Sequence, residues 1–382
     1  MADDLNHPAV IVAATATGTI GVVVFALLPI YIGQIAERFD LDDVQTGLTA
    51  SSYFLVYALI SLSAPFWVRR WNWRHAVPIG CGVMITGLLG LLAADSALTV
   101  MIAFSITGAG AAVQLPISLT LVSDMRNTER IYALTIALGQ LVPAIMLLGI
   151  SAGWYGAYSL INTVYVTLLV VFVCLVLNFR LPSRGSVAPR IPGVSAPKPI
   201  YATAGLAGLA INFAAFAAMW AFFERIAAES GFDADFAARW IAVGLIMTAV
   251  GPFFSAWLAD RLGRAVPLIV PTTLAAASMA LLAGTVTPPI YAIVLVVFPL
   301  GYYIALSFML SIIADADPNG SVSSLMSFAF ACGALAGPAL FGYLRGTENA
   351  ELWLIGVALL GGVAIVLWVH RRIAGMPQHH LS

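Results

Sequence analysis

The residues best suited to hold a ligand lie in an apolar run just past the middle of the chain. Asn212, Phe216, Trp220 and Glu224 recur every four residues, so on a helix they stay within about 120° of one another and form one stripe. An amide, two aromatic faces and a carboxylate suit a ligand with a flat or apolar body and a polar end. The alternative is a packed stripe in which Trp220 belongs to an aromatic belt at a membrane surface.

Glu224 stands apart from the rest of this stripe. At 1.5 Å per residue it lies about 18 Å from Asn212 along a helix, which places it near the outer end of this membrane-spanning run. There it can pair with Arg225 or Arg239, or it can take up and release a proton. We therefore expect a coupling or gating role for Glu224 and Arg225.

Other neutral polar side chains interrupt the apolar runs and are further candidates for ligand contact. They are Tyr53, Tyr57, Gln114, Gln140, Tyr302 and Tyr303. Each of them could instead form a hydrogen bond between two helices. No run carries a charge near its centre, which disfavours a central proton relay and a multiply charged anionic substrate.

Metal, cofactor and enzyme chemistry find little support in the sequence. The three cysteines all fall inside apolar runs, so neither a disulfide framework nor a metal cluster is predicted. The five histidines lie at or beyond the ends of the runs: His7, His75, His370, His379 and His380. We expect no bound cofactor or metal and no catalytic site.

The composition identifies the class of protein that must position these residues. Of the 382 residues, 61% are apolar and only 9% are charged, whereas ordinary globular proteins are roughly 45 to 50% apolar and about 25% charged. The chain is therefore predicted to be an all-α membrane protein surrounded by the lipid bilayer. Its net charge of -1 gives no case for nucleic-acid binding.

Twelve apolar runs are long enough to cross a bilayer, which takes about 20 helical residues. They cover about residues 10–36, 44–68, 76–94, 98–123, 131–152, 155–179, 200–226, 236–258, 265–285, 289–313, 322–344 and 352–370. If the N-terminus is cytoplasmic, thirteen of the seventeen basic residues fall in inside connections. Because Lys and Arg favour the cytoplasmic side, both termini are predicted to be cytoplasmic.

An internal repeat divides the chain into two halves. Residues 110–124 match residues 301–315 at an offset of 191, with a glycine, two leucines and a final aspartate in common. We predict two pseudo-symmetric six-helix bundles, residues 1–179 and 200–382, joined by a cytoplasmic linker at 180–199 that holds four basic residues, five prolines and no acid. Parallel six-helix repeats are one of the transporter designs with a substrate site between the halves.

Asp260-Arg261-Leu262-Gly263-Arg264, between the eighth and ninth runs, makes the resemblance specific. This loop, the twelve runs and the basic linker resemble the major facilitator superfamily, whose signature loop reads Asp-Arg-x-Gly-Arg. The duplicate loop at 69–74 has Arg69 in place of the aspartate and Asn72 in place of the glycine. The resemblance implies that the neutral polar residues line a central cavity.

The resemblance also implies a cytoplasmic latch that closes in the outward-facing state. Asp260 would approach the N-terminus of the fifth helix, where an anion gains roughly 0.3 to 1 kcal/mol. The other expected members are Arg261, Gly263, Arg264 and Asp315 in the second half, and Asp124 with Arg69, Arg70 or Arg74 in the first. Simple anchoring of these arginines at the lipid headgroups is the alternative.

The function expected from the resemblance is transport, either coupled to an ion gradient or facilitative. The substrate would be a small organic solute, aromatic or a monocarboxylate, moved across a bacterial-type inner membrane by alternating access, with protons as a candidate coupling ion and the chain acting as a monomer. A sugar is not excluded, because Gln, Asn and Tyr are its usual partners. The alternative is a proton-coupled antiporter that exports drugs or other amphiphiles.

Overall fold

The structure is a computed structural model that describes residues 5, 7–125, 128–156, 158–184, 199–316, 325–347 and 349–374. Its regular elements within these ranges are helices. They are α1 (Pro8–Ala26), α2 (Leu28–Phe39), α3 (Asp43–Trp67), α4 (Trp73–Ala93), α5 (Ala97–Ser123), α6 (Thr128–Ser151), α7 (Leu160–Leu177), η1 (Asn178–Arg180), α8 (Pro199–Glu229), α9 (Ala234–Leu262), α10 (Ala265–Ala280), η2 (Leu281–Ala283), α11 (Pro288–Asp315), α12 (Met326–Leu344) and α13 (Ala350–Ala374).

Within the described residues, twelve helical segments are long and apolar enough to cross a membrane. This confirms the predicted number of spans and the all-α fold. Apolar side chains also cover the outside of the bundle, with Ile79, Phe172 and Val357 each more than 60% exposed. An apolar surface of this extent is matched to lipid rather than to water, and the protein is a multi-pass membrane protein.

The first apolar run differs from the prediction, because it forms two helices rather than one. Proline has no N–H and interrupts a helix, and Pro29 stands at the start of α2, immediately after the break at Leu27. The N–H of Ile30 donates to the carbonyl of Leu27 across this break. The carbonyl of Ala26 lies at the same break, and it accepts a hydrogen bond from another helix, described below.

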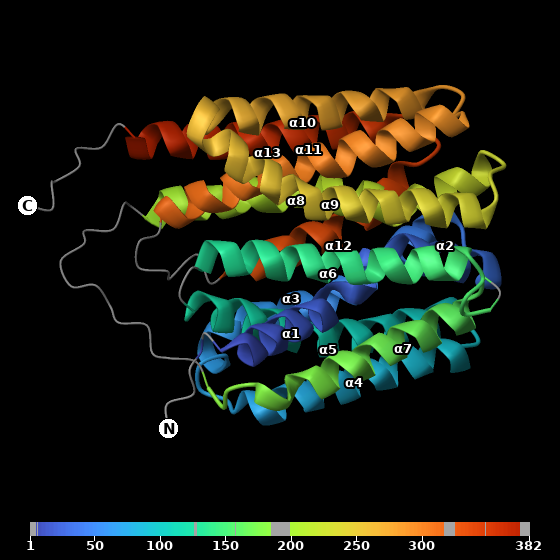
Figure 1. The fold of residues 1–382 in the computed structure, drawn as a ribbon. Helices are drawn as coiled ribbons and strands as arrows, with labels where there is room; N and C mark the ends of the chain where they lie inside the picture. The colour runs from blue at the N-terminus through green and yellow to red at the C-terminus, as the bar shows by residue number, and fades with distance from the viewer. Residues whose placement is uncertain are drawn as a thin grey trace, which may run out of the picture.

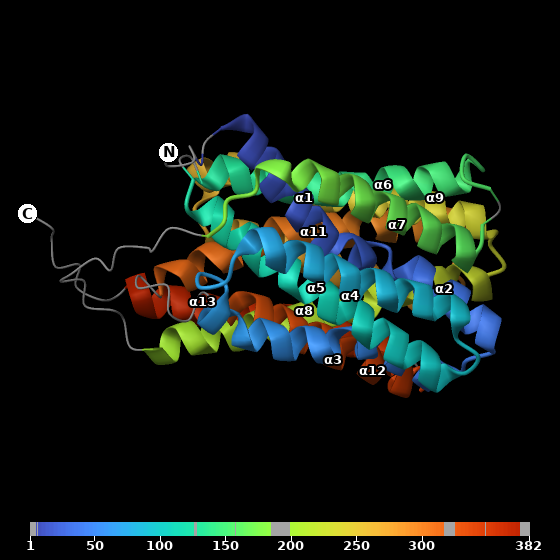
Figure 2. The same ribbon diagram turned by 90° about the horizontal axis from the view of Figure 1, so that it is seen from below.

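The helices pack in two groups that run side by side (Figures 1 and 2). In one group α1 packs on α5, α6 and α7, and α5 packs on α3 and α4; in the other, α8 packs on α12 and α13, and α11 packs on α9 and α10. The groups meet where α3 packs on α12, α6 on α9 and α2 on α8. We refer to α1–α7 as the first half and α8–α13 as the second half.

The two ends of the bundle are distinguished by the chain. We call the end at which α1 begins and α13 ends the terminal end; it lies to the left in Figure 1. The opposite end, where α2 is followed by α3, is the distal end. If the termini are cytoplasmic, as predicted, the distal end faces outward.

Candidate functional site

A cluster of aromatic rings lies where the two halves meet. Its centre is Phe216 of α8, whose ring stacks on Tyr302 (centroids 4.3 Å apart), Phe298 (5.4 Å) and Trp220 (5.6 Å). Phe25 of α1 adds a ring from the first half, 6.4 Å from Phe216. We call the rings of Phe25, Phe213, Phe216, Trp220, Phe298, Tyr302 and Tyr303 the central aromatic cluster. Their mutual packing supplies broad apolar faces between the halves.

Two hydrogen bonds at this cluster join the halves directly. The side-chain amide of Gln140 in α6 donates to the hydroxyl of Tyr303 in α11, over 3.2 Å. The indole N–H of Trp220 in α8 donates to the carbonyl of Ala26, over 3.3 Å. Because Ala26 ends α1 at the break before Pro29, the sequence at this break positions an acceptor for Trp220.

A narrow gap, too small to hold a water molecule, remains beside these groups. Gln140, Phe216, Trp220 and Tyr303 line it, together with Thr248 of α9. Because the gap is this small, a solute would enter only when the halves separate. Four of the residues that we expected to bind substrate therefore border one space between the halves.

Three further tyrosines that we expected to bind substrate lie near this gap but do not line it: Tyr53, Tyr57 and Tyr302. Tyr302 stacks on Phe216, and its buried hydroxyl has no hydrogen-bond partner among the described residues. Tyr53 and Tyr57 lie on α3, with ring centroids 6.1 Å apart, and both pack against Phe54. Phe54 in turn meets the ring of Phe25 edge-on at 5.5 Å. The tyrosine pair therefore contacts the central aromatic cluster through Phe54.

Gln114 and Asn212 lie elsewhere, between helices of a single half. The amide of Gln114 in α5 donates to the carbonyl of Val77 in α4, over 3.1 Å. The amide of Asn212 in α8 donates to the carbonyl of Leu359 in α13, over 2.8 Å. Each step of four residues turns the helix by about 40°, so Asn212 lies at one edge of the stripe, where it bonds to α13, while Phe216 and Trp220 pack in the cluster.

We expect Gln114→Ala and Asn212→Ala to lower stability and to leave substrate affinity unchanged. Each change removes a buried hydrogen bond between helices, worth about 1 kcal/mol in membrane proteins. Gln140→Ala should instead raise the half-saturation of exchange, because it removes a group that borders the gap between the halves. Thermal unfolding and the half-saturation of exchange, measured on all three variants, separate the two roles. A large rise in half-saturation for Gln114→Ala would contradict this assignment.

Glu224 is buried near the distal end, against the backbone of α2. Its side chain is 8% exposed, and a Cβ built on Gly33 would overlap the carboxylate. Only glycine at position 33 allows this approach. In the described part of the chain Glu224 forms no ion pair, although Arg225 follows it. A buried carboxylate without an ion-pair partner is costly to ionise.

Tyr158, in the connection between α6 and α7, lies close to this carboxylate. Burial, and after it the charge of Glu224, raise the pKa of Tyr158 well above its usual value. The phenol therefore keeps its proton at physiological pH. Its hydroxyl has no partner among the described residues, so it is available to donate to an anionic group.

Four charged residues tie the halves together at the distal end. Arg225 of α8 pairs with Asp43 of α3 at 2.7 Å and with Glu229 of α8 at 3.2 Å. Arg345, which follows α12, pairs with Asp43 at 3.5 Å and with Glu229. We call Asp43, Arg225, Glu229 and Arg345 the distal network. Asp43 is its only member from the first half, and both arginines reach it.

Of this network, only Arg225 was predicted from the sequence to be functional. The signal available in the sequence was the scarcity of basic residues at this end: Arg225 and Arg345 are two of the four predicted to lie outside. Asp43 and Glu229 carried no such signal, because they stand near other acids at helix ends. Their pairing depends on how the halves dock.

At the terminal end, the described ion pairs each lie within one half. Arg69 holds Asp124 through two nitrogens, with contacts of 3.0 to 3.1 Å. Arg264 pairs with Asp315 in the second half. Asp124 and Asp315 are the matching ends of the internal repeat. In each half, the final aspartate of the repeat thus pairs with an arginine of the loop between the second and third membrane-spanning helices of that half.

The other expected members of the latch lie around these pairs. Arg74 donates to the carbonyl of Leu181, and Arg70 is exposed. The guanidinium of Arg261 lies 4.3 Å from the centroid of the Trp257 ring. Gly263 ends α9 with a positive φ of 62°, a conformation that favours glycine. The side chain of Asp260 lies outside the described residues, as do residues 185–198 of the predicted linker.

Comparison with known proteins agrees with this arrangement. The profile of the Major Facilitator Superfamily matches residues 10–340. No curated relative matches the chain. The described His, Cys, Asp and Glu residues include no group of three or more that could hold a metal ion.

Solved transporter structures share the fold at low sequence identity. A bacterial homologue of the human lysosomal transporter Spinster, inward-facing and occupied, is 17% identical, with a TM-score of 0.69 over 97% of this chain and 96% of that one. A D-xylose–proton symporter is 13% identical, with a TM-score of 0.74 over 94% and 96%. The transporter FucP in the outward conformation is 14% identical, with a TM-score of 0.64 over 98% and 100%. With the family profile covering most of its length, the chain belongs to the major facilitator superfamily of transporters.

Proposed function

We propose that this protein moves a small organic solute across a bacterial-type inner membrane by alternating access. The proposal rests on where along the bundle the two halves contact each other. Polar contacts join the halves at the central aromatic cluster and at the distal network, whereas the ion pairs described at the terminal end stay within each half. A structure closed at one end is one of the two states that alternating access requires.

The central aromatic cluster favours a solute with an aromatic or other flat apolar body. Stacked rings supply contact area and orientation together, and Gln140 with Tyr303 supplies polar groups beside them. A monocarboxylate fits this proposal, with its acid group directed to the amide of Gln140 and the tyrosine hydroxyls. Tyr53 and Tyr57 are proposed to contact the solute when the halves move apart.

Glu224 is the candidate for proton coupling. It is a buried carboxylate without an ion-pair partner among the described residues, it lies between α8 and α2 of opposite halves, and the Tyr158 hydroxyl lies nearby. Neutralising such a carboxylate by protonation removes the cost of burying its charge. Proton uptake at Glu224 would therefore favour the closed distal end.

Export of amphiphilic compounds by proton antiport is the second candidate. The broad aromatic faces around Phe216 would accept such compounds as readily as a small aromatic acid. The two candidates differ in the direction of net movement. Accumulation in inverted membrane vesicles supports export, and accumulation in right-side-out vesicles supports uptake.

The remaining features of the proposal follow from the repeat and the packing. We propose that residues 1–179 and 200–382 move as two bundles joined by the linker at 180–199, with both termini in the cytoplasm. We propose that one chain suffices, because the central aromatic cluster draws its rings from the two halves of a single chain. Lipid surrounds the bundle, and no cofactor takes part.

Asp260→Asn should slow transport severalfold while leaving membrane insertion intact. The loss of one carboxylate weakens the closed terminal end of the outward-facing state, because an anion near a helix N-terminus is worth about 0.3 to 1 kcal/mol. Arg69→Asp, made in the same background, should not restore the rate, since Arg69 already holds Asp124. Unchanged transport by Asp260→Asn at normal expression would exclude the latch.

The transport proposal is tested by exchange in proteoliposomes. Solutes that raise the unfolding temperature of the purified protein identify ligands, since binding to the folded state stabilises it. A ligand of the central aromatic cluster should then undergo counterflow, with exchange of labelled for unlabelled solute that needs no gradient. If solutes that bind at the cluster never exchange across the membrane, the protein is a binding protein or receptor and the proposal fails.

A further inference from the structure

Helix α13 presents an apolar face to the outside of the bundle, and this face ends in two arginines. Four large side chains on it are each more than 40% exposed: Trp353, Val357, Leu360 and Trp368. On a helix these positions lie within about 80° of one another. Arg371 comes about five full turns after Trp353, and therefore on the same face. An exposed apolar face of this kind on a membrane protein contacts lipid.

The length of this face matches the thickness of a bilayer. At 1.5 Å per residue, Arg371 lies about 27 Å from Trp353 along the helix, and the hydrocarbon core of a bilayer is about 30 Å thick. Trp and Tyr side chains are enriched at the two boundaries of this core, and Trp353 and Trp368 lie near the two ends of the face. The arginines at the terminal end therefore lie at the level of the lipid headgroups.

Aromatic rings and guanidinium groups gather where α13 ends beside α8. The guanidinium of Arg372 lies 5.8 Å from the centroid of the Trp368 ring. The ring of Tyr201, at the start of α8, has its centroid 5.7 Å from that of Trp368. We call Tyr201, Trp368, Arg371 and Arg372 the α13 basic cluster. Because both arginines are exposed and follow the apolar face, their charged ends can reach the headgroup layer.

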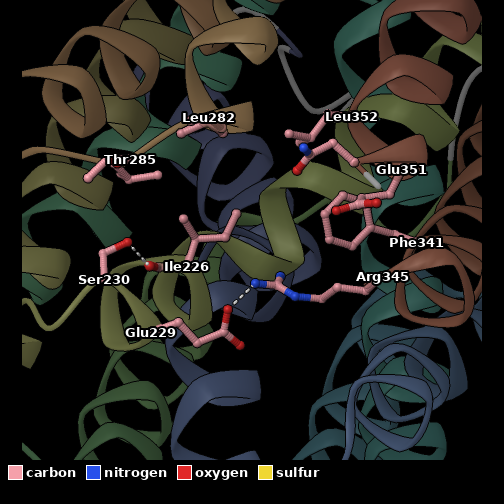
Figure 3. A pocket seen from close by; sticks show the side chains of 12 residues that line it. Ile226, Glu229, Ser230, Leu282, Thr285, Phe341, Arg345, Glu351 and Leu352 are labelled. Carbon is pink, nitrogen blue, oxygen red and sulfur yellow. Dashed lines mark hydrogen bonds and ion pairs between the residues drawn. The ribbon is translucent and has the colours of Figure 1, made fainter. Parts of the chain in front are cut away.

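The two arginines of this cluster have no carboxylate partner in the described part of the chain. At the distal end, in contrast, Arg345 is directed toward Glu229 and pairs with it (Figure 3). Hydrogen bonds from a guanidinium to a phosphate are charge-assisted and frequently bidentate. Arg371 and Arg372 are therefore free to bind an anionic group of the surrounding membrane.

We propose that the α13 basic cluster binds the headgroup of an anionic phospholipid. The phosphate accepts hydrogen bonds from Arg371 and Arg372, and the acyl chains lie along Val357 and Leu360. Two arginines beside one phosphate favour a headgroup without a positive charge, because they would repel the ammonium group of a zwitterionic lipid. A free phosphate ion has no chains to cover the apolar face, so a lipid binds more tightly. The central aromatic cluster takes no part in this site.

Lipid binding is tested on the purified full-length protein in a non-ionic detergent, with dioctanoyl phosphatidylglycerol as the probe. Dioctanoyl phosphatidylcholine has the same chains and a zwitterionic headgroup, and inorganic phosphate has no chains. We expect phosphatidylglycerol to raise the unfolding temperature along a saturating curve, because a ligand of the folded state stabilises it. Phosphatidylcholine should need a concentration at least about fivefold higher, and phosphate should have no saturating effect.

Two double variants locate the binding site. An arginine near an anionic membrane surface contributes about fivefold in affinity, so Arg371→Gln with Arg372→Gln should weaken phosphatidylglycerol binding by about tenfold or more. Arg180→Gln with Arg184→Gln is the matched control, because it removes two exposed arginines just after α7, on the opposite side of the bundle (Figure 1). It should change the affinity by at most about twofold, since distant surface charges are screened by salt.

All four arginines are exposed, so both double variants should fold. Wild-type affinity for phosphatidylglycerol in Arg371→Gln with Arg372→Gln, or an equal loss of affinity in the control, would overturn the proposal. Equal stabilisation by phosphatidylcholine would show that the headgroup charge is irrelevant, and equal stabilisation by phosphate would assign the cluster to a free anion. Either of these results would also overturn it.

Discussion

We expect Glu224→Gln to abolish accumulation of solute under an imposed pH gradient and to preserve counterflow exchange. Glutamine resembles the protonated carboxylate in shape and in neutrality, so both closed and open states stay accessible. Net proton movement, however, is lost with the titratable group. Exchange needs no net proton movement, so its rate should stay within about a factor of two of wild type, whereas accumulation should fall to the level of liposomes without protein.

Glu229→Gln is the matched control for this prediction. Glu229 lies on the same helix but its side chain is 47% exposed and paired with both arginines of the distal network, so we expect it to alter the rate and not the coupling. If Glu224→Gln accumulates solute normally, coupling lies elsewhere. If wild type concentrates solute under neither a pH nor a sodium gradient, the protein is a uniporter and Glu224 acts as a gate.

We expect Phe216→Leu to raise the half-saturation of exchange by about two- to tenfold, which corresponds to the loss of one aromatic stacking partner. The Phe216 ring stacks on three others, and aromatic pairs contribute about 0.5 to 1.5 kcal/mol each beyond the area that they bury. A solute that takes the place of one of these three rings would stack on Phe216. The Phe216→Leu change removes that stacking partner. Leucine keeps much of the buried apolar volume, so the variant should remain folded.

Phe104→Leu supplies the matched control. Phe104 is fully buried and packs edge-on against Tyr31 and Tyr53, but it lies within the first half. Its replacement should cost stability and leave the half-saturation of exchange unchanged. Equal increases in half-saturation for Phe104→Leu and Phe216→Leu would mean that the cluster only supports the fold.

The fold was predictable because its signal is spread over the whole chain. Twelve apolar runs, the excess of arginine in alternate connections and the repeat at an offset of 191 residues are properties of many residues at once. The break at Leu27 was missed although Pro29 signals it. A long apolar run reads as one span by hydropathy alone, and hydropathy does not register the missing N–H of proline.

The candidate site was predictable only in part, because polar residues in apolar runs serve two purposes. Residue type gave no means of separating Gln140, which bridges the halves, from Gln114, which bridges two helices of one half. Only the direction of each side chain around its helix separates them. The distal network was missed for a related reason, since it depends on how helices distant in sequence dock.

The most direct test of alternating access is thiol labelling at two positions, one toward each end, in a background without Cys81, Cys174 and Cys332. Ser51→Cys reports on the distal side, where the hydroxyl of Ser51 accepts a hydrogen bond from the N–H of Ala339 between α3 and α12. Ser307→Cys reports on the terminal side, one helical turn beyond Tyr303.

Asp43→Asn weakens the distal network and should therefore shift the protein toward the state that is open at the distal end. Alternating access predicts opposite changes: maleimide should react severalfold faster with Ser51→Cys and more slowly with Ser307→Cys. Faster reaction at both positions, or no change at either, would contradict alternating access in this protein.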